Sequence, residues 1–190
     1  MLCVSSWPVF QIPMPETMKE PMPLRYKKTL KFLREHVPPG ARILDLGTPN
    51  PFSGIMARSG YRVQNTSGED LDTDYSFVNE VDVDYITSFE VFEHLLAPFN
   101  LLREIKKGRL VSSVPLKVWF ARAYWNPSDE WDRHYHEFEP RQYDWLLRKS
   151  GWTIVRSETW ASPDRIRPGI RPFMRFVWPS YYFVYAEKGV

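Results

Sequence analysis

Residues 41–54 read Ala-Arg-Ile-Leu-Asp-Leu-Gly-Thr-Pro-Asn-Pro-Phe-Ser-Gly, and this stretch decides the fold class. A short apolar run leads to Asp45 and Gly47, and a turn then continues toward a helix. This order is typical of the first strand and turn of an α/β domain that binds nucleotides. Pro49 and Pro51 interrupt the turn, and each lacks a backbone N–H and has φ fixed near about −65°. The stretch therefore predicts both the fold and an altered ligand loop.

The rest of the chain alternates between helix and strand character. The spacing of apolar residues, together with Pro and Gly residues that end helices, predicts four helices, over 24–36, 53–59, 93–107 and 142–150. It also predicts six strands, over 41–46, 61–66, 84–89, 109–114, 152–159 and 181–187. This alternation predicts an α/β, Rossmann-like fold, a mostly parallel sheet with helices on both faces. The interval between 66 and 84 is too short for a full helix and another strand. We therefore expect the sheet to be abbreviated there.

The composition limits the classes of function. With 25 basic and 23 acidic residues, the 190-residue chain has a net charge of +2, so overall charge does not favour nucleic-acid binding. No apolar run is long enough to predict a transmembrane segment, and the first 15 residues do not resemble a signal peptide. Cys3 is the only cysteine, which indicates a reducing compartment. We expect a cytoplasmic protein.

The chain divides into an arm and a domain. Residues 1–22 are rich in Pro and Met and lack periodicity, which predicts an N-terminal arm, and 23–190 is expected to be a single domain. Aromatic residues crowd the segment of about 116–140, which either covers the end of the sheet or forms a lid over an acceptor. Between Arg165 and Arg175 four arginines occur without an acid, which indicates a solvated loop or a weak membrane-surface or phosphate contact.

Four blocks in order carry a family resemblance. They are Asp45-Leu46-Gly47, the 84–95 segment ending in Glu90-Val91-Phe92-Glu93-His94-Leu95, the 109–115 strand, and 136–152 with its Gly151-Trp152 end. Together they resemble class I S-adenosylmethionine-dependent methyltransferases of the small-molecule type. The resemblance implies a Rossmann-like methyltransferase fold that is abbreviated between the second and fourth strands. It implies S-adenosylmethionine as the cofactor and a small-molecule or lipid-like acceptor.

The chemistry of that cofactor indicates where it would bind. Its carboxylate suits N–H groups at a glycine turn, and its ribose suits a carboxylate after the second strand, while the end of the fourth strand would line the site. On the resemblance, the cofactor-binding residues are Asp45, Gly47, Thr48, Pro49, Glu69, Asp70, Ser88, Phe89 and Glu90. Of the family's three loop glycines only Gly47 remains.

Three histidines are candidates for catalysis. Transfer to oxygen or nitrogen often uses a general base, for which histidine suits neutral pH, and the candidates are His94, His134 and His136. His134 and His136 flank Tyr135 and would face one side of an extended segment. With Asp132 or Glu137 they offer metal-binding groups, but no tight ligand spacing is present, so no metal site is expected.

Two other functions stay open beside methyl transfer. The prolines in the loop favour a degenerate methyltransferase-like domain that binds a ligand or a partner without catalysis. An NAD-type oxidoreductase fits less well, because a pyrophosphate would need the loop glycines even more.

Overall fold

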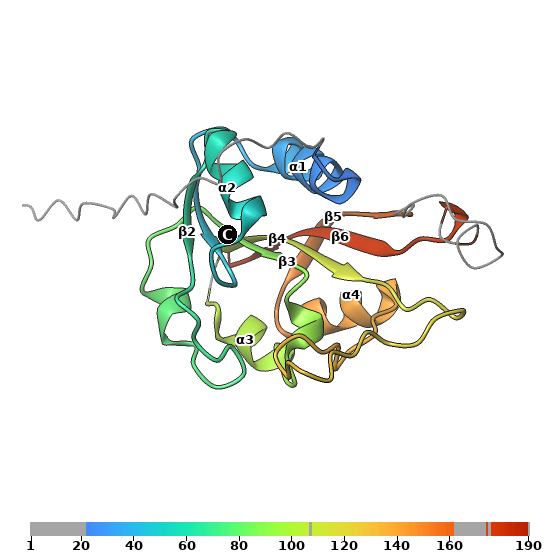
Figure 1. Cartoon of the computed structure of the whole chain (residues 1–190). Coiled ribbons are helices and arrows are strands. Elements are labelled where there is room, and N and C mark those ends of the chain that lie inside the picture. The colour runs from blue at the N-terminus through green and yellow to red at the C-terminus, as the bar shows by residue number, and fades with distance from the viewer. Residues whose placement is uncertain (1–21, 107, 162–173, 175, 190) are drawn as a thin grey trace, which may run out of the picture.

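Figure 1 shows a computed structural model of the chain, which describes residues 22–106, 108–161, 174 and 176–189. Within these residues six strands form one sheet in the order β2-β1-β3-β4-β6-β5. They are β1 (Arg42–Asp45), β2 (Arg62–Asn65), β3 (Tyr85–Phe89), β4 (Gly108–Pro115), β5 (Thr153–Trp160) and β6 (Tyr181–Lys188). The neighbours among β1 to β4 pair in parallel, and β6 pairs antiparallel with β4 and β5. The expected mostly parallel sheet is confirmed.

The sheet is abbreviated where the sequence indicated. After β2 the chain passes through one short 3₁₀ helix, η1 (Ser76–Asn79), and then enters β3 on the other side of β1. β2 is therefore an edge strand in the described part of the chain. The strand order reverses at β1, and open α/β sheets bind ligands at such a switch point.

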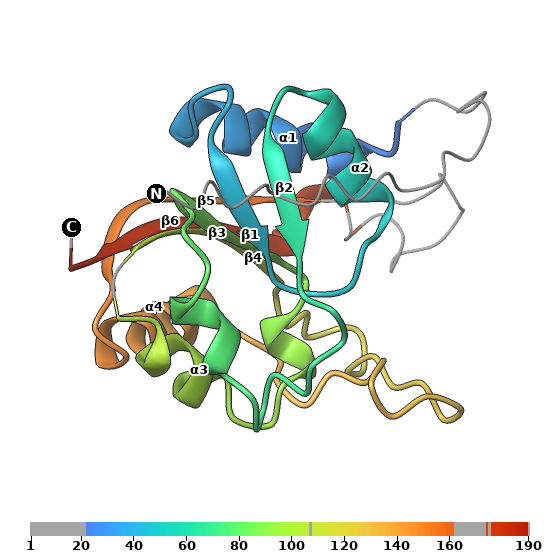
Figure 2. The same ribbon diagram turned by 90° about the vertical axis from the view of Figure 1, so that its left-hand side faces the viewer.

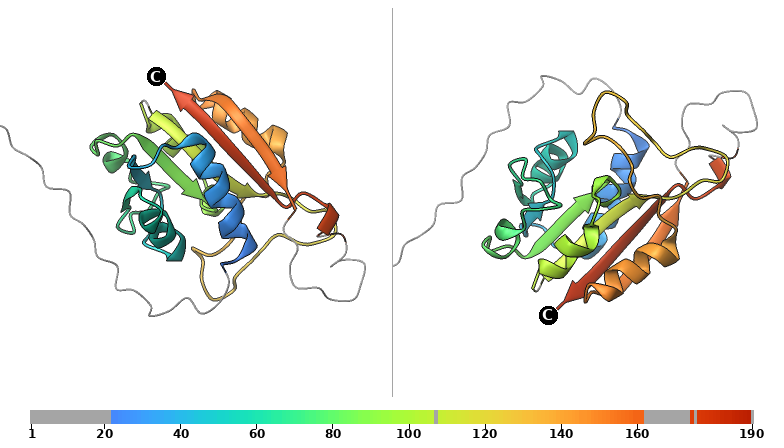
Figure 3. Two further views of the ribbon diagram at one scale, coloured as in Figure 1. Left: turned by 90° about the horizontal axis from the view of Figure 1, so that it is seen from above. Right: turned by 90° about the horizontal axis from the view of Figure 1, so that it is seen from below.

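Helices cover both faces of the sheet, as the sequence predicted. In Figures 2 and 3, α1 (Leu24–His36) and α2 (Pro51–Arg58) lie on one face, and α3 (Pro98–Glu104) and α4 (Pro140–Lys149) lie on the other. Each face has its own buried core, with Phe32 and Ile43 in the first and Leu101 and Leu147 in the second. Burial of these apolar side chains on two faces of one sheet holds the layers together.

One predicted helix is wrong in its extent. The segment of 93–107 contains a short 3₁₀ helix, η2 (Phe92–His94), a break, and then α3 from Pro98. Pro98 lacks the N–H that a helix interior needs, so it is placed at the first turn of α3 instead. Asp72 fixes the break, because its carboxylate accepts hydrogen bonds from the backbone N–H groups of Leu96 (2.9 Å) and Ala97 (2.7 Å).

Some expectations lie outside the described residues. Except for Met22, the predicted arm of 1–22 lies outside the described residues. The four arginines from Arg165 to Arg175 also lie outside them. The aromatic segment is described. It leaves β4 near Leu116, which forms a bridge with Phe138, and Figure 2 shows it in yellow to gold as a long loop projecting from the layers. No helix in the described residues is both long and apolar enough to cross a membrane.

Candidate functional site

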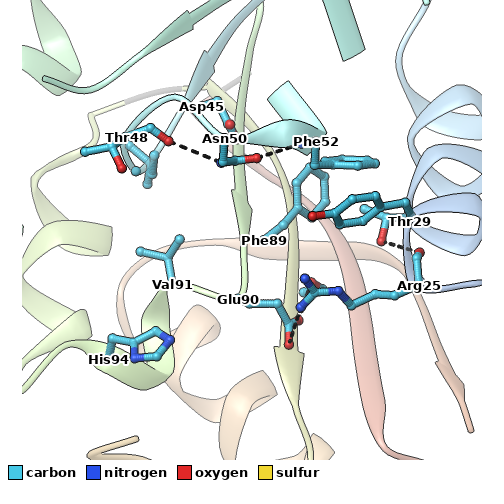
Figure 4. Close-up of a pocket in the computed structure, with 14 residues that line it drawn as sticks. Arg25, Thr29, Asp45, Thr48, Asn50, Phe52, Phe89, Glu90, Val91 and His94 are labelled. Carbon is cyan, nitrogen blue, oxygen red and sulfur yellow. Dashed lines mark hydrogen bonds and ion pairs between the residues drawn. The ribbon is translucent and has the colours of Figure 1, made fainter. Parts of the chain in front are cut away.

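A cleft of about 370 Å³ opens at the carboxyl ends of β1, β3 and β4, with α1 as one wall. This volume lies within the range of small-molecule sites, roughly 300–1,000 Å³. Figure 4 shows the cleft between the loop after β1 and the corner after β3. The lining residues are Arg25, Tyr26, Thr29, Asp45, Leu46, Gly47, Thr48, Asn50, Phe52, Phe89, Glu90, Val91, His94 and Ser113. The cleft therefore coincides with the topological switch point.

Four backbone N–H groups of the loop after β1 have hydrogen-bond partners within the protein. The N–H of Gly47 donates to Thr66 Oγ1 (2.9 Å), and the N–H of Asn50 donates to Ser53 Oγ (2.9 Å). Asn50 Oδ1 caps α2 by accepting from the N–H groups of Phe52 (2.9 Å) and Ser53 (3.1 Å). A ligand carboxylate would have to displace these bonds to use the same donors.

Pro51 fits the local backbone. Pro51 is at the first turn of α2, where a helix N–H has no intrahelical partner in any case. Gly47 has φ of 116°, and a Cβ at that position would meet only Val91 Cγ2 at 3.8 Å. Its glycine is therefore required by backbone conformation and not by crowding. The loss of the later glycines is accommodated by a capped helix start.

Asp45 ends β1 as a buried carboxyl group. Thr87 Oγ1 donates to its Oδ1 at 2.6 Å, and Asn65 Nδ2 donates to its Oδ2 at 3.0 Å. Burial raises the pKa of Asp45 to about 7, although both hydrogen bonds act in the opposite direction. Asn65 Nδ2 also donates to the Gly47 carbonyl (3.2 Å), so this network ties the strand end to the loop.

Glu90 turns the chain after β3 in a strained conformation. It is the one non-glycine residue with positive φ (58°) among the described residues. Ser113 Oγ donates to its Oε1 at 2.7 Å, and Arg25 Nη1 lies 3.8 Å from its Oε2, as Figure 4 shows. Burial raises the pKa of Glu90 to about 7, while Ser113 and Arg25 oppose the shift. The cleft thus holds one cation beside one carboxyl group that titrates near neutrality.

Glu93 and two histidines meet next to this corner. Glu93 is fully buried, and neither carboxylate oxygen has a hydrogen-bond partner. Burial, followed by the nearby Glu90, raises the Glu93 pKa well above its ordinary value. His94 Nε2 lies 3.8 Å from Glu93 Oε1, and the His94 and His134 rings are 4.9 Å apart at their centroids. Burial and the neighbouring His94 lower the pKa of His134 to about 4.

The structure brings together only part of the predicted site. Asp45, Gly47, Thr48, Phe89, Glu90 and His94 line the cleft, whereas Pro49, Glu69, Asp70, Ser88, His134 and His136 are not among its lining residues. Glu69 accepts from the Ser67 N–H at 2.6 Å, and Asp70 accepts from the Asp72 N–H at 3.0 Å. These two carboxylates therefore brace their own turn, and their predicted contact with a ribose stays a prediction.

Sequence reasoning missed the contribution of α1. Arg25, Tyr26 and Thr29 line the cleft from α1, whereas no role for this helix in the site was predicted from the sequence. Phe52 was also missed, and its ring packs edge-on against Phe89 with centroids 5.3 Å apart.

The switch-point cleft and the strand order define a Rossmann-like ligand-binding domain. More specifically, residues 18–157 match the methyltransferase domain family, and the chain belongs to that family. This confirms the resemblance found in the sequence. A search of curated protein sequences found no match to the chain.

Solved structures of methyltransferases share the fold. A Burkholderia thailandensis 1,6-didemethyltoxoflavin-N1-methyltransferase with bound S-adenosylhomocysteine is 21% identical, with a TM-score of 0.55, over 87% of this chain and 78% of that chain. An S-adenosylmethionine-dependent methyltransferase from Mesorhizobium loti is 17% identical, with a TM-score of 0.53, over 83% and 96%. A chain of the complex that contains the Haloferax volcanii Trm112 methyltransferase activator is 18% identical, with a TM-score of 0.57, over 86% and 89%. At these identities the likeness shows the fold.

Proposed function

We propose that this domain transfers a methyl group from S-adenosylmethionine to a small-molecule or lipid-like acceptor. Family membership supports methyl transfer and this cofactor. The observation that carries the proposal for this chain is the cleft at the switch point, which contains a cation, a carboxyl group and aromatic rings together. The acceptor is not specified by these features beyond its having to fit beside the cofactor. A cytoplasmic location stays a prediction.

The cleft residues fit the charges of the cofactor. Because the amides of Gly47, Asn50, Phe52 and Ser53 already have partners, Arg25 is the charged group best placed to bind the cofactor's carboxylate. Glu90 and the rings of Phe52 and Phe89 offer a carboxylate and π faces to the positive sulfonium. Glu69 and Asp70 stay candidates for the ribose hydroxyls, provided that their turn moves toward the cleft when the cofactor binds.

His94 is the best candidate for the base among the three histidines, because it lines the cleft. Its Nδ1 lies 3.0 Å from the carbonyl oxygen of Arg133, which can only accept, so Nδ1 carries the proton and Nε2 a lone pair. S-adenosylmethionine would supply the methyl group to the acceptor's O or N, with S-adenosylhomocysteine as the leaving product, and His94 Nε2 would accept the acceptor's proton.

His134 and His136 would then act from outside the cleft. His134 packs on His94, and His136 stacks on Phe138 with its Nε2 3.2 Å from the Leu96 carbonyl oxygen. Their role is to hold the aromatic segment against the Glu93–His94 corner. The backbone N–H groups of Tyr135 (2.8 Å) and His136 (3.1 Å) both donate to the Glu93 carbonyl and support this reading.

The second candidate function is ligand or partner binding without catalysis. It is favoured by the loop after β1, because the amides of Gly47, Asn50, Phe52 and Ser53 are engaged within the protein. Calorimetric titration with S-adenosylmethionine and separately with NAD tests the cofactor. Incubation with S-adenosylmethionine and a metabolite mixture, followed by assay of S-adenosylhomocysteine, tests catalysis. Binding without product supports the second candidate, and no binding at millimolar ligand overturns the first.

A further inference from the structure

A buried carboxylate and two imidazoles converge at the His94 end of the cleft. Oxygen or nitrogen atoms of Glu93, His94 and His134 all lie within 4.8 Å of one another. Glu93 and His94 lie in η2, and His134 lies 40 residues after His94 in the aromatic segment. The cluster therefore exists only in the folded chain. We propose that Glu93, His94 and His134 form a binding site for one divalent transition-metal ion of the zinc type.

The state of Glu93 points independently to a ligand. A carboxyl group that is fully buried with both oxygens unpartnered is costly, and native proteins rarely leave one so. The cation nearest to the corner, Arg25, is directed at the other carboxylate, with its Nη1 3.8 Å from Glu90 Oε2. A bound cation would give Glu93 the partner that the described residues do not supply.

The His94 ring is oriented for coordination, and backbone bonds hold His134 beside it. His94 donates from Nδ1 to the Arg133 carbonyl (3.0 Å), so its Nε2 lone pair faces Glu93 Oε1 at 3.8 Å. A carbonyl that accepts from the second ring nitrogen is the usual support of a metal-binding histidine. The His134 N–H donates to the Tyr124 carbonyl (3.1 Å), and the next two backbone N–H groups donate to the Glu93 carbonyl. These bonds hold both ligand-bearing segments together.

The set of donors selects the class of metal. Two imidazoles with one carboxylate suit Zn²⁺ and its neighbours, whereas Mg²⁺ and Ca²⁺ prefer oxygen ligands. Bonds of about 2.0–2.2 Å put tetrahedral ligands about 3.3–3.5 Å apart, so binding requires small side-chain rotations from the present separations. Three protein ligands leave a position open, and His94 lines the cleft. An acceptor oxygen would occupy that position. With the metal bound, His94 Nε2 would be a ligand, and the metal would replace His94 as the group that assists loss of the acceptor's proton, a role which rests on the proposed function.

The test titrates Zn²⁺ into the full chain after chelator treatment and removal of the chelator. We expect one ion per chain with a Kd of about 1 μM or tighter, and at least a tenfold loss of affinity in each of His94→Gln and His134→Gln. His36→Gln is the matched control, because His36 lies on α1 with its Nδ1 at the Phe32 carbonyl and is not in the cluster. Its affinity should stay within twofold of the native value.

Three results would overturn the site: no stoichiometric binding at about 100 μM Zn²⁺, unchanged affinity in His134→Gln, or an equal loss in His36→Gln. Circular dichroism confirms that each variant is folded, and Glu93→Gln, which keeps the shape of the side chain, is a further ligand variant. Because the titration needs no S-adenosylmethionine, the two hypotheses fail separately. A chain that binds Zn²⁺ but not the cofactor keeps the metal site and loses the proposed function, and the converse result removes only the metal site.

Discussion

The two segments that face each other across the cleft are built in opposite ways. In the loop from Gly47 to Ser53, the amides of Gly47, Asn50, Phe52 and Ser53 donate to Thr66, Ser53 and Asn50. The corner from Glu90 to His94 has a positive φ at its first residue and an unpartnered buried carboxylate at Glu93. Strain and perturbed ionisation concentrate at functional sites. On the function proposed above, we therefore expect the corner and the facing Arg25, more than the loop, to bind the ligand.

The largest expected effect concerns Asp45, which joins the loop to the sheet. Its pKa is about 7 in the folded chain and is ordinarily near 3.8, so between about pH 4 and pH 7 the unfolded state loses its proton first. The free energy of unfolding should therefore fall as pH rises through this window, by an amount on the order of 4 kcal/mol from this group. Below about pH 4 both states hold the proton, so the stabilising contribution of this group is fully present and no longer changes with pH.

Asp45→Asn isolates that effect, because it keeps the shape and cannot ionise. Urea unfolding at several pH values should show a native-minus-variant difference that changes by a few kcal/mol between pH 4 and pH 8. The pKa values of Glu90 and Glu93 are also raised, so these groups change the free energy of unfolding with pH in the same direction in both proteins, and their effects cancel in the native-minus-variant difference. A difference that is flat with pH would mean that Asp45 ionises as easily as an exposed carboxyl group.

The next effect concerns the ribose. If Glu69 or Asp70 accepts the ribose hydroxyls, alanine there should weaken S-adenosylmethionine binding by about 1.5–3 kcal/mol, the range for hydrogen bonds that involve a charged group. Asp74→Ala is the matched control, since Asp74 lies in the same turn and bonds Ser76. Calorimetric affinities that are equal in both single variants, the double variant and the control would exclude the contact.

A smaller effect tests whether the loop is independent of the ligand. Asn50→Ala removes the cap of α2 and should cost about 0.5–2 kcal/mol of stability, while Asn50→Asp keeps an acceptor oxygen and should cost less. Thermal unfolding measures both. Cofactor affinity should change by less than about threefold in either variant. A large loss of affinity with both substitutions would show that the Asn50 amide holds the cofactor directly.

The sequence predicted the framework well because the framework is local. Asp45 and Gly47 marked a strand end and a turn, and the short interval from 66 to 84 correctly indicated an abbreviated sheet. The helix predicted over 93–107 was wrong in its extent because the prediction followed the apolar spacing and gave no weight to Pro98. The hydrogen bonds from Leu96 and Ala97 to Asp72, which also interrupt the helix, depend on a residue distant in the chain. Pro51 was interpreted as a defect in a loop, whereas it starts a helix.

The site was harder to predict because its members are distant in the chain. Arg25 meets Glu90 only after α1 packs across the sheet, and His134 reaches Glu93 only when the aromatic segment folds back. The spacing of residues within one segment cannot predict contacts between segments that are distant in the chain. The burial of Glu93 also depends on the whole fold, so the sequence from Glu90 to His94 did not predict that this carboxyl group would be buried without a partner.

The most direct test of the shift from loop to corner is a paired titration of S-adenosylmethionine. Arg25→Met keeps an unbranched apolar stem and removes the charge, whereas the double variant Pro49→Gly with Pro51→Gly restores two loop N–H groups. We expect Arg25→Met to weaken binding by about 1.5–3 kcal/mol, roughly 10- to 150-fold, and the double glycine variant to bind within about threefold of the native chain. Tighter binding by the glycine variant together with native affinity in Arg25→Met would contradict the account and return the cofactor's carboxylate to the loop.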